Sequence, residues 1–386
     1  MSAPNGSTEG GDGPPPQKKQ KQVRVWVDGC FDMVHFGHAN ALRQAKLMGD
    51  VLVAGVHSDA EIKRNKGPPV MNEKERYKMV RAIKWVDEVV EDVPYTTSLE
   101  VMEKYNCDFC AHGDDITINV DGVDAYAAVK AAGKYKEYKR TQGVSTTDLV
   151  GRMLLMTKQH LSTNDEKSAE STQLSKITQG SELHSPYTGS SQFLASSKRL
   201  IEFMGTDSRE PAPGDTVVYV AGAFDLFHAG HVVLLEKCRE IGNFIIVGLH
   251  SDWEVNRYKG KNYPIMNVQE RVLSVLACKY VSDVIIGAPY TVTEFMLDSL
   301  KINFVVQGQT PVYLDEHGND PYEVPKKRGI YQTVDSGNIL TTDAIVKRII
   351  QNRLQFARRN SVKEEKEIMV VEAEKKRRES TQGTTS

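Results

Sequence analysis

The chain has 386 residues, and its 49 lysines and arginines nearly balance its 51 aspartates and glutamates, for a formal net charge of −2. This balance creates no overall positive field, so the composition gives no support to a nucleic-acid partner. No run of about 18 apolar residues is present, which excludes a predicted transmembrane segment. Five scattered cysteines and an N-terminus without an apolar signal core predict a cytoplasmic protein with reduced thiols.

The first part of the chain alternates between strand-like and helical patterns. Residues 1–22 are rich in Gly, Pro and Lys and are expected to form a disordered tail. Short β-branched runs at 23–27, 51–56, 88–90 and 109–111 predict strands, and the segments 38–48, 73–83 and 98–105 predict helices. This alternation is typical of the α/β class and predicts a doubly wound parallel sheet in a first domain at 23–156.

The composition then changes twice more. Residues 157–213 are expected to form a linker, rich in Ser, Thr, Gln and Asn up to residue 189 and with a short helical pattern at 192–204. A second domain is predicted at 214–359, and residues 360–386 form a highly charged tail.

One motif occurs in both predicted domains. His35-Phe36-Gly37-His38 returns 193 residues later as His228-Ala229-Gly230-His231, and Lys66-Gly67 returns at the same offset as Lys259-Gly260. The likeness continues for more than a hundred residues, which is too long for a solenoid or propeller unit. The sequence therefore predicts two tandem Rossmann-like domains that arose by duplication.

The motif falls on the turn between the first strand and the first helix of each domain, a turn that includes Gly29 and Phe31 in the first copy. In a doubly wound sheet this turn presents backbone N–H groups to anionic ligands. His35 and His38 are three residues apart, so both rings can face one ligand, and Gly37 lets a phosphate approach the backbone. Two isolated histidines would usually be unrelated side chains, but the recurrence of the motif favours a functional pair.

A second polar segment precedes the last helical pattern of the first domain. It contains one arginine, one glycine and several hydroxyls: Arg140, Thr141, Gly143, Ser145, Thr146 and Thr147. Ser and Thr at this place are also explained by N-capping of a helix. An anion clamp accounts in addition for the arginine. Lys66, in a loop bounded by Gly and Pro, is a candidate third cation or an ordinary solvated lysine.

These two motifs resemble the signatures of the cytidylyltransferase family of nucleotidyltransferases, His-x-Gly-His and Arg-Thr-x-Gly-x-Ser-Thr-Thr. The resemblance covers all but the N-terminal tail, the linker and the last 30 or so residues. Two modules in one chain are similar to the ethanolamine-phosphate branch of that family, whereas the choline-phosphate branch carries one module and a lipid-binding helical tail. The resemblance implies that the CMP moiety of CTP is transferred to phosphoethanolamine, with release of pyrophosphate.

The resemblance also implies roles for individual residues. His35, His38 and Lys66 would stabilise the reacting phosphates, and Mg²⁺ would arrive on CTP rather than in a metal site of the protein. Asp28, Tyr95 and Tyr126 would surround the ammonium group. Asp114 is a weaker candidate for contact with substrate or base, and a turn aspartate is the alternative. The residues expected to bind CTP are Gly29, Phe31, Gly37, Arg140, Thr141, Ser145, Thr146 and Thr147.

The second copy retains only part of this set. His228, His231, Lys259 and the pair Thr341-Thr342 are kept. At a constant offset Arg140 falls on Asp335 and Ser145 on Leu340, and Asp28 is replaced by Ala221. An aspartate beside a triphosphate is repulsive, so the second copy is expected to have a structural or regulatory role, with nucleotide binding as the alternative.

Other interpretations remain open from the residues alone. The acceptor could instead be phosphocholine or glycerol 3-phosphate, and the donor could be ATP as in adenylyl-transferring relatives. A nucleotide-sensing scaffold without turnover is the alternative from another class. The sequence also leaves open whether the chain forms a homodimer, touches a membrane peripherally or is phosphorylated in its linker.

Overall fold

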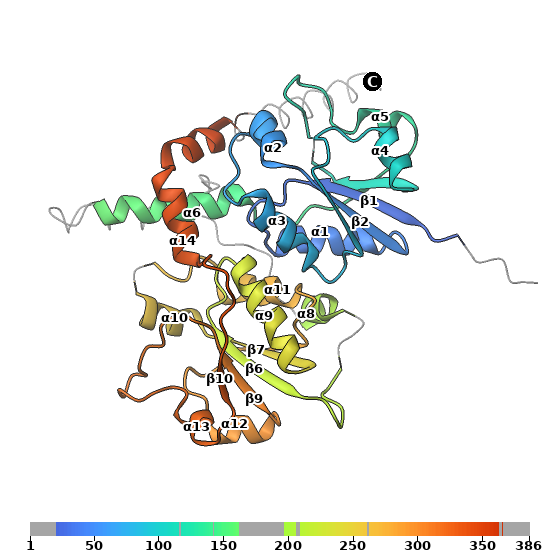
Figure 1. Ribbon diagram of the computed structural model, residues 1–386. Helices are drawn as coiled ribbons and strands as arrows, with labels where there is room; N and C mark the ends of the chain where they lie inside the picture. The colour runs from blue at the N-terminus through green and yellow to red at the C-terminus, as the bar shows by residue number, and fades with distance from the viewer. Residues whose placement is uncertain are drawn as a thin grey trace, which may run out of the picture.

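The computed structural model describes residues 21–115, 117–141, 143–161, 197–205, 209–260, 262–362 and 365. Nearly all of the predicted N-terminal tail, most of the linker and most of the charged C-terminal tail therefore lie outside the described residues. The described part forms two α/β modules, which Figure 1 shows with the first module, blue to green, above the second, yellow to red.

The first module is a parallel five-stranded sheet in the order β3-β2-β1-β4-β5. Its central strand contains Val25, Trp26 and Val27, all buried, as expected for a parallel strand covered by helices on both faces. The elements are β1 (Arg24–Gly29), α1 (Phe36–Lys46), β2 (Val51–Val56), α2 (Asp59–Lys66), α3 (Glu73–Arg81), β3 (Glu88–Glu91), α4 (Leu99–Lys104), β4 (Phe109–Gly113), α5 (Ala127–Ala131), β5 (Tyr135–Tyr138) and α6 (Thr146–Leu161).

The second module repeats this topology after the linker helix α8 (Ser197–Met204). Its strand order, β10-β9-β6-β7-β8, is the order of the first sheet read from the other edge, and all pairs are parallel. The elements are β6 (Val217–Gly222), α9 (Ala229–Ile241), β7 (Phe244–Leu249), α10 (Asp252–Lys259), α11 (Val268–Leu276), β8 (Asp283–Ile286), α12 (Glu294–Ser299), β9 (Phe304–Gln307), α13 (Glu323–Lys327), β10 (Tyr331–Thr333) and α14 (Thr342–Gln351). The predicted fold class, two tandem doubly wound domains, is confirmed.

The boundaries differ in detail from the predicted ones. Helix α6 extends past the predicted domain end at 156, and a helical segment at 353–362 extends past the predicted end at 359. The expected loop at Lys66 is wrong, because Lys66 is the last residue of α2 and Gly67 ends that helix with φ +89°.

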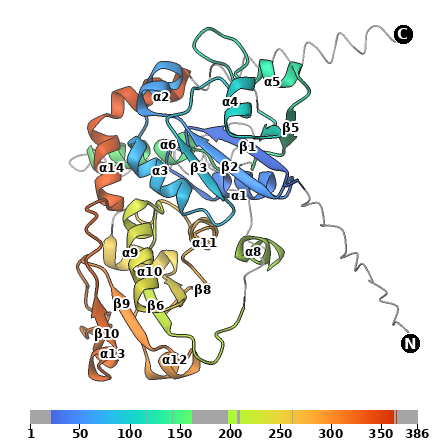
Figure 2. The same ribbon diagram turned by 45° about the vertical axis from the view of Figure 1, so that its right-hand side comes forward.

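The two modules pack against each other around an approximate two-fold axis. One hydrophobic cluster contains residues of both modules, and Figure 2 shows α1 and α3 facing α9 and α11. At the centre Ile83 and Cys278, equivalent positions of the repeat, form an antiparallel bridge. The amide of Lys84 donates to Ala277 O (3.0 Å), and the amide of Lys279 donates to Ala82 O (2.8 Å).

Two equivalent ion pairs join the modules on either side of this axis. Arg152 of α6 contacts Glu270 of α11 through Nη1 and Nη2, each at 2.9 Å. Arg348 of α14 contacts Glu75 of α3 at 2.8 and 3.0 Å. Each glutamate also accepts the amide of its own helix cap, so the same side chains start a helix and hold the partner module.

Candidate active site

The two histidines of the first module start helix α1. His35 is the N-cap, and its Nδ1 accepts a hydrogen bond from the amide of Gly37 (3.1 Å). His38 Nδ1 accepts the amide of His35 (3.4 Å), which completes a capping box made of two imidazoles. The ring centroids are 4.1 Å apart. A neutral ring whose Nδ1 accepts carries its proton on Nε2, so Nε2 is the donor atom of each histidine.

Gly37 has no room for a side chain. A Cβ atom there would lie 2.8 Å from His35 Cε1 and 2.8 Å from Val144 Cγ1. The sequence predicts that Gly37 admits a phosphate, and the structure adds that it lets the segment 140–147 lie directly against the histidine motif.

The segment 140–147 is tied to the histidine motif at two more points. Thr141 Oγ1 accepts a hydrogen bond from Asn40 Nδ2 of α1 (2.9 Å), and Thr146 Oγ1 donates to the backbone oxygen of Asp32 (2.7 Å). Ser145 Oγ accepts the amide of Asp148 (3.0 Å), as an N-cap of α6 does. The N-capping interpretation is therefore confirmed for Ser145, and the segment lies against the histidine motif. The anion clamp stays a prediction.

Arg140 lies two residues after β5 and is exposed. Asp114 Oδ1 accepts its amide (2.9 Å), and Asp115 Oδ2 accepts its guanidinium (3.1 Å). Burial alone would raise the pKa of Asp115, but Arg140 and His112 offset this effect and lower it. Asp114 thus makes a backbone contact expected of a turn aspartate, and Asp115 holds the guanidinium of Arg140. A contact of Asp114 with substrate or base stays a prediction.

Lys66 reaches the site from the end of α2. Its Nζ lies 5.5 Å from the ring centroid of Tyr95. The electrostatic interaction with Cys30 has the largest effect on the pKa of Lys66 and raises it. The ammonium group therefore stays charged at neutral pH. The adjacent loop is fixed by Asp32, whose carboxylate accepts the amides of Val70 (2.9 Å) and Met71 (2.8 Å).

Asp28 is buried at the end of β1 and receives three donors. Tyr126 OH donates at 2.7 Å, Trp26 Nε1 at 3.0 Å, and Thr97 Oγ1 also donates. The structure therefore brings Asp28 and Tyr126 into contact, and their assignment to the ammonium group stays a prediction. Thr97 and Trp26 are not identified by the sequence alone, because their roles depend on contacts between distant segments.

Two further histidines lie beside these residues. His57 packs against Tyr95 (centroids 5.1 Å apart), and His112 packs against Tyr126 (4.4 Å). Burial lowers the pKa of both rings. His57 recurs as His250 in the second module, and this repeat is the sequence signal that could have identified His57 as a candidate site residue.

Arg76 is the main structural residue that the sequence alone does not identify. It is fully buried, and its guanidinium donates to Cys30 O (2.7 Å), His57 O (2.7 Å) and Asp59 Oδ1 (2.7 Å). One arginine thereby fixes the ends of β1 and β2 and the start of α2.

The second module preserves the histidine geometry. His228 Nδ1 and His231 Nδ1 accept the equivalent amides at 3.2 and 3.3 Å, and the ring centroids are 3.9 Å apart. Burial, aided by Lys259, lowers the pKa of His228 to about 3. Burial also lowers the pKa of His231 far below its usual value.

The register of the second clamp differs from the constant offset. Thr342 Oγ1 donates to Asp225 O in the same way as Thr146 Oγ1 donates to Asp32 O, and Thr341 caps α14 as Ser145 caps α6. One extra residue before β10 causes this shift, since Tyr331 pairs with Val305 where Tyr135 pairs with Cys110.

The shift changes the equivalences inferred from the sequence. Arg140 corresponds to Ser336, not to Asp335, and Ser145 corresponds to Thr341, not to Leu340. The predicted charge reversal is therefore wrong, although the arginine is still lost. Asp28 still corresponds to Ala221.

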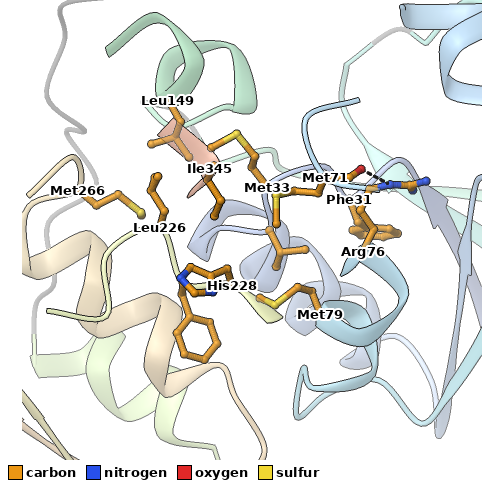
Figure 3. A pocket seen from close by; sticks show the side chains of 12 residues that line it. Phe31, Met33, Met71, Arg76, Met79, Leu149, Leu226, His228, Met266 and Ile345 are labelled. Carbon is orange, nitrogen blue, oxygen red and sulfur yellow. Dashed lines mark hydrogen bonds between the residues drawn. The ribbon is translucent and has the colours of Figure 1, made fainter. Parts of the chain in front are cut away.

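A small cavity lies between the modules, and its lining is mostly apolar apart from Arg76 and His228. It measures about 10 Å³, and Figure 3 shows methionines of the first module facing Leu226 and His228 of the second. This volume holds no more than about one water, so the cavity belongs to the packing between the two histidine loops. Within the described ranges, no helix is long and apolar enough to cross a membrane, and no three His, Cys, Asp or Glu side chains gather as metal ligands.

Comparison with known proteins gives consistent matches. The cytidylyltransferase-like family matches residues 26–152 and again 219–372. An ethanolamine-phosphate cytidylyltransferase of Mus musculus is 56% identical, over 92% of this chain and 93% of that protein. The protein of the same description from Dictyostelium discoideum is 54% identical, over 92% of this chain and 98% of its own. A choline-phosphate cytidylyltransferase of Arabidopsis thaliana is 42% identical, over 35% of this chain and 45% of its own.

Proposed function

The chain belongs to the cytidylyltransferase-like family, and from this premise we propose that its first module carries the chemistry. The protein is a nucleotidyltransferase of phospholipid synthesis: it transfers the CMP moiety of CTP to phosphoethanolamine, giving CDP-ethanolamine and pyrophosphate. The relatives that act on phosphoethanolamine match nearly the whole tandem chain, whereas the choline-phosphate relative matches about one module.

Both modules bring the histidine motif against the segment that precedes their last helix, and the arginine of that segment supports the first module in particular. The histidine motif and the segment 140–147, a hundred residues apart, meet at the start of α1, with Val144 against Gly37 and Thr141 bonded to Asn40. Helix N-termini favour anions, and here two imidazole donors and an arginine are added to the backbone amides. In the second module Ser336 replaces the arginine.

The reaction suits such a site. An oxygen of the phosphoethanolamine phosphate attacks the α-phosphorus of CTP, and the bond from that phosphorus to the bridging oxygen breaks, so that pyrophosphate leaves with the electron pair. A phosphate monoester is largely dianionic near neutral pH, since its second pKa is about 6, and needs no strong base. In-line positioning and neutralisation of charge are what the protein must supply.

We assign these roles to individual side chains. His35 and His38 donate from Nε2 to oxygens of the α-phosphate, and Lys66 adds a positive charge there. Arg140, Thr141 and the amides at the start of α6 hold the β- and γ-phosphates. Thr146 already donates its hydroxyl proton to Asp32 O, so it positions the start of α6 rather than donating to phosphate. CTP enters as its Mg²⁺ complex, because the triphosphate supplies the oxygens that Mg²⁺ prefers.

The ammonium group is assigned to Asp28. A primary ammonium has three N–H donors and favours a carboxylate, whereas trimethylammonium favours an aromatic cage. Asp28 is held by Tyr126 and Trp26, and Tyr95 packs beside it in the same cluster. Ala221 in the second copy removes this carboxylate.

Pyrophosphate release tests the proposal. The purified full chain is supplied with CTP or ATP and with phosphoethanolamine, phosphocholine or glycerol 3-phosphate. We expect the highest kcat/KM for CTP with phosphoethanolamine. A higher value for another pair would replace the substrate assignment, and no turnover with any pair would favour the scaffold interpretation.

We also propose that the protein works in the cytoplasm. All five cysteines are free thiols, and four are buried in the cores of the two modules. Unpaired cysteines are typical of reducing compartments.

A further inference from the structure

A helical segment of the second module returns to the first module. After α14 the chain forms a second helical run at 353–362, which lies beside α2 in both views (Figures 1 and 2). Arg359 of this segment is only 12% exposed in its side chain. Its Nη1 donates to Pro68 O (2.8 Å) and to Asp32 Oδ2 (3.3 Å).

Pro68 and Gly67 directly follow Lys66. A Cβ atom at Gly67 would lie 3.4 Å from Arg359 Cγ, so the stem of the arginine packs against this glycine. Gly67 has φ +89°, a conformation that suits glycine and turns the chain sharply after the helix. Arg359 therefore contacts the two residues that follow Lys66, and these residues determine the path of the chain after α2.

Asp32 extends the same network to both other parts of the site. Its carboxylate holds the amides of Val70 and Met71, and its backbone oxygen accepts Thr146 Oγ1. Asp32 itself lies on the turn that leads into the histidine motif. Arg359 thus closes a network that joins the histidine turn, the Lys66 loop and the clamp.

A neighbouring residue makes a second contact. Asn360 is buried, and its Nδ2 donates to Thr147 O (3.4 Å) in the first turn of α6. The helical segment 353–362 therefore contacts the loop after Lys66 on one side and the clamp helix on the other.

The second copy has no such arrangement among the described residues. Asp225, the counterpart of Asp32, accepts the amides of Ile265 (2.7 Å) and Met266 (3.0 Å), and no described arginine donates to its carboxylate. Among the described residues, the contact is therefore found only at the site that keeps Arg140.

We propose that Arg359 is a positioning residue for the first active site, which fixes the Lys66 loop from the second module. This inference rests on the proposed function, because it needs Lys66 to act on the reacting phosphates. It also gives the second module a specific role, since its C-terminal helical segment supplies a part that the first module lacks.

A double-mutant cycle in the full chain tests the proposal. Arg359→Ala is expected to lower kcat about 10–100-fold, the scale for a misplaced group, with a smaller change in the KM of either substrate. Arg359→Lys keeps one donor and should recover part of the loss. Arg358 is the exposed residue that directly precedes Arg359 in the same helix, and Arg358→Ala should leave kcat unchanged.

The second half of the cycle tests whether Arg359 acts through Lys66 or independently of it. If Arg359 acts through Lys66, then Arg359→Ala in a Lys66→Ala background should lower kcat less than about twofold further. The same fold loss in both backgrounds, or an Arg359→Ala enzyme equal to Arg358→Ala, would overturn the proposal. A wild-type chain without turnover on CTP and phosphoethanolamine would instead refute the proposed function, and wild-type turnover by Lys66→Ala would refute the role of Lys66 on which the inference depends.

Discussion

The imidazole of His35 has a separate role for each ring nitrogen. Nδ1 accepts the amide of Gly37 and starts helix α1, and Nε2 is the donor that we assign to the α-phosphate. Alanine at this position would remove both roles at once, so an alanine variant cannot separate catalysis from folding. Asparagine separates them, because its side-chain oxygen is a good N-cap and it has no ring donor at the same place.

We therefore predict that His35→Asn lowers kcat about 10²–10³-fold, the usual effect of losing one preorganised donor, while the melting temperature changes little. The matched control is His228→Asn, the same change at the same helix position of the second module. Steady-state kinetics and thermal unfolding of both variants check this. Near-normal turnover of His35→Asn, or an equal loss in both variants, would contradict the assignment.

Buried histidines also predict how stability depends on pH. Burial lowers the pKa of His250 to about 4, so the unfolded chain binds a proton near pH 6.5 that the folded chain does not bind until about pH 4. The contribution of His250 to the free energy of unfolding is fully present above pH 6.5. It falls as the pH drops to 4, by about 3 kcal/mol at most.

His250→Leu should make this acid loss of stability less steep. Its Nε2 has no hydrogen-bond partner among the described residues, so the variant gives up only the contact of Nδ1 with Tyr258 OH (3.2 Å). His317→Leu is the control, because that side chain is exposed. Denaturant unfolding between pH 7 and 4 measures the slopes, and equal slopes in wild type and His250→Leu would refute the prediction.

At the scale of secondary-structure elements, α3 and α11 join their caps to the contact between the modules. Glu270 is 1% exposed and pairs with Arg152, whereas Glu75 is 14% exposed and pairs with Arg348. Removing one partner of a buried pair leaves a charge without its counter-ion. The two equivalent pairs thus differ in how deeply the remaining carboxylate would be buried.

We predict that Arg152→Ala lowers the free energy of unfolding by about 3–5 kcal/mol, and Arg348→Ala by less. Arg81→Ala, which breaks a solvent-exposed pair with Glu91, should cost less than about 1 kcal/mol. Equilibrium denaturation of the three variants ranks them. An Arg152→Ala protein as stable as Arg81→Ala would show that the pair contributes little to holding the modules together.

The elements also show what the sequence could predict. The strands at 51–56, 88–90 and 109–111 follow from runs of Val and other apolar residues, and all are present. Helix α2 escapes prediction because Gly67, Pro68 and Pro69 mark a turn, and this signal lies after the helix rather than in it. The short elements α5 and β5 carry too few residues for a periodic pattern.

The candidate site was predictable to a similar degree. The repeat identified the histidine motif and Lys66. The family resemblance grouped Asp28 with Tyr126, and their side chains are hydrogen-bonded in the structure. The register of the second clamp was not predictable, because one extra residue before β10 is visible only through strand pairing. The contacts of Arg76 and Arg359 join segments far apart in the chain, and no local pattern reports them.

At the scale of the whole molecule, near-symmetric packing is combined with unequal sites. The two modules share their topology, the central bridge between Ile83 and Cys278 and the paired histidines. They differ where ligands would bind, since the second copy lacks the counterparts of Arg140 and Asp28. The central claim is therefore that one of the two modules binds CTP for turnover.

Calorimetric titration of the full chain with CTP and Mg²⁺ tests this claim most directly. We predict one CTP per chain, with a Kd raised about 10–150-fold by Arg140→Ala, because a charge-assisted hydrogen bond is worth about 1.5–3 kcal/mol. Lys139→Ala, an exposed neighbour, is the control and should leave the Kd unchanged. Two equivalents of CTP with similar affinity, or one that persists in Arg140→Ala and is lost in Lys259→Ala, would contradict the account.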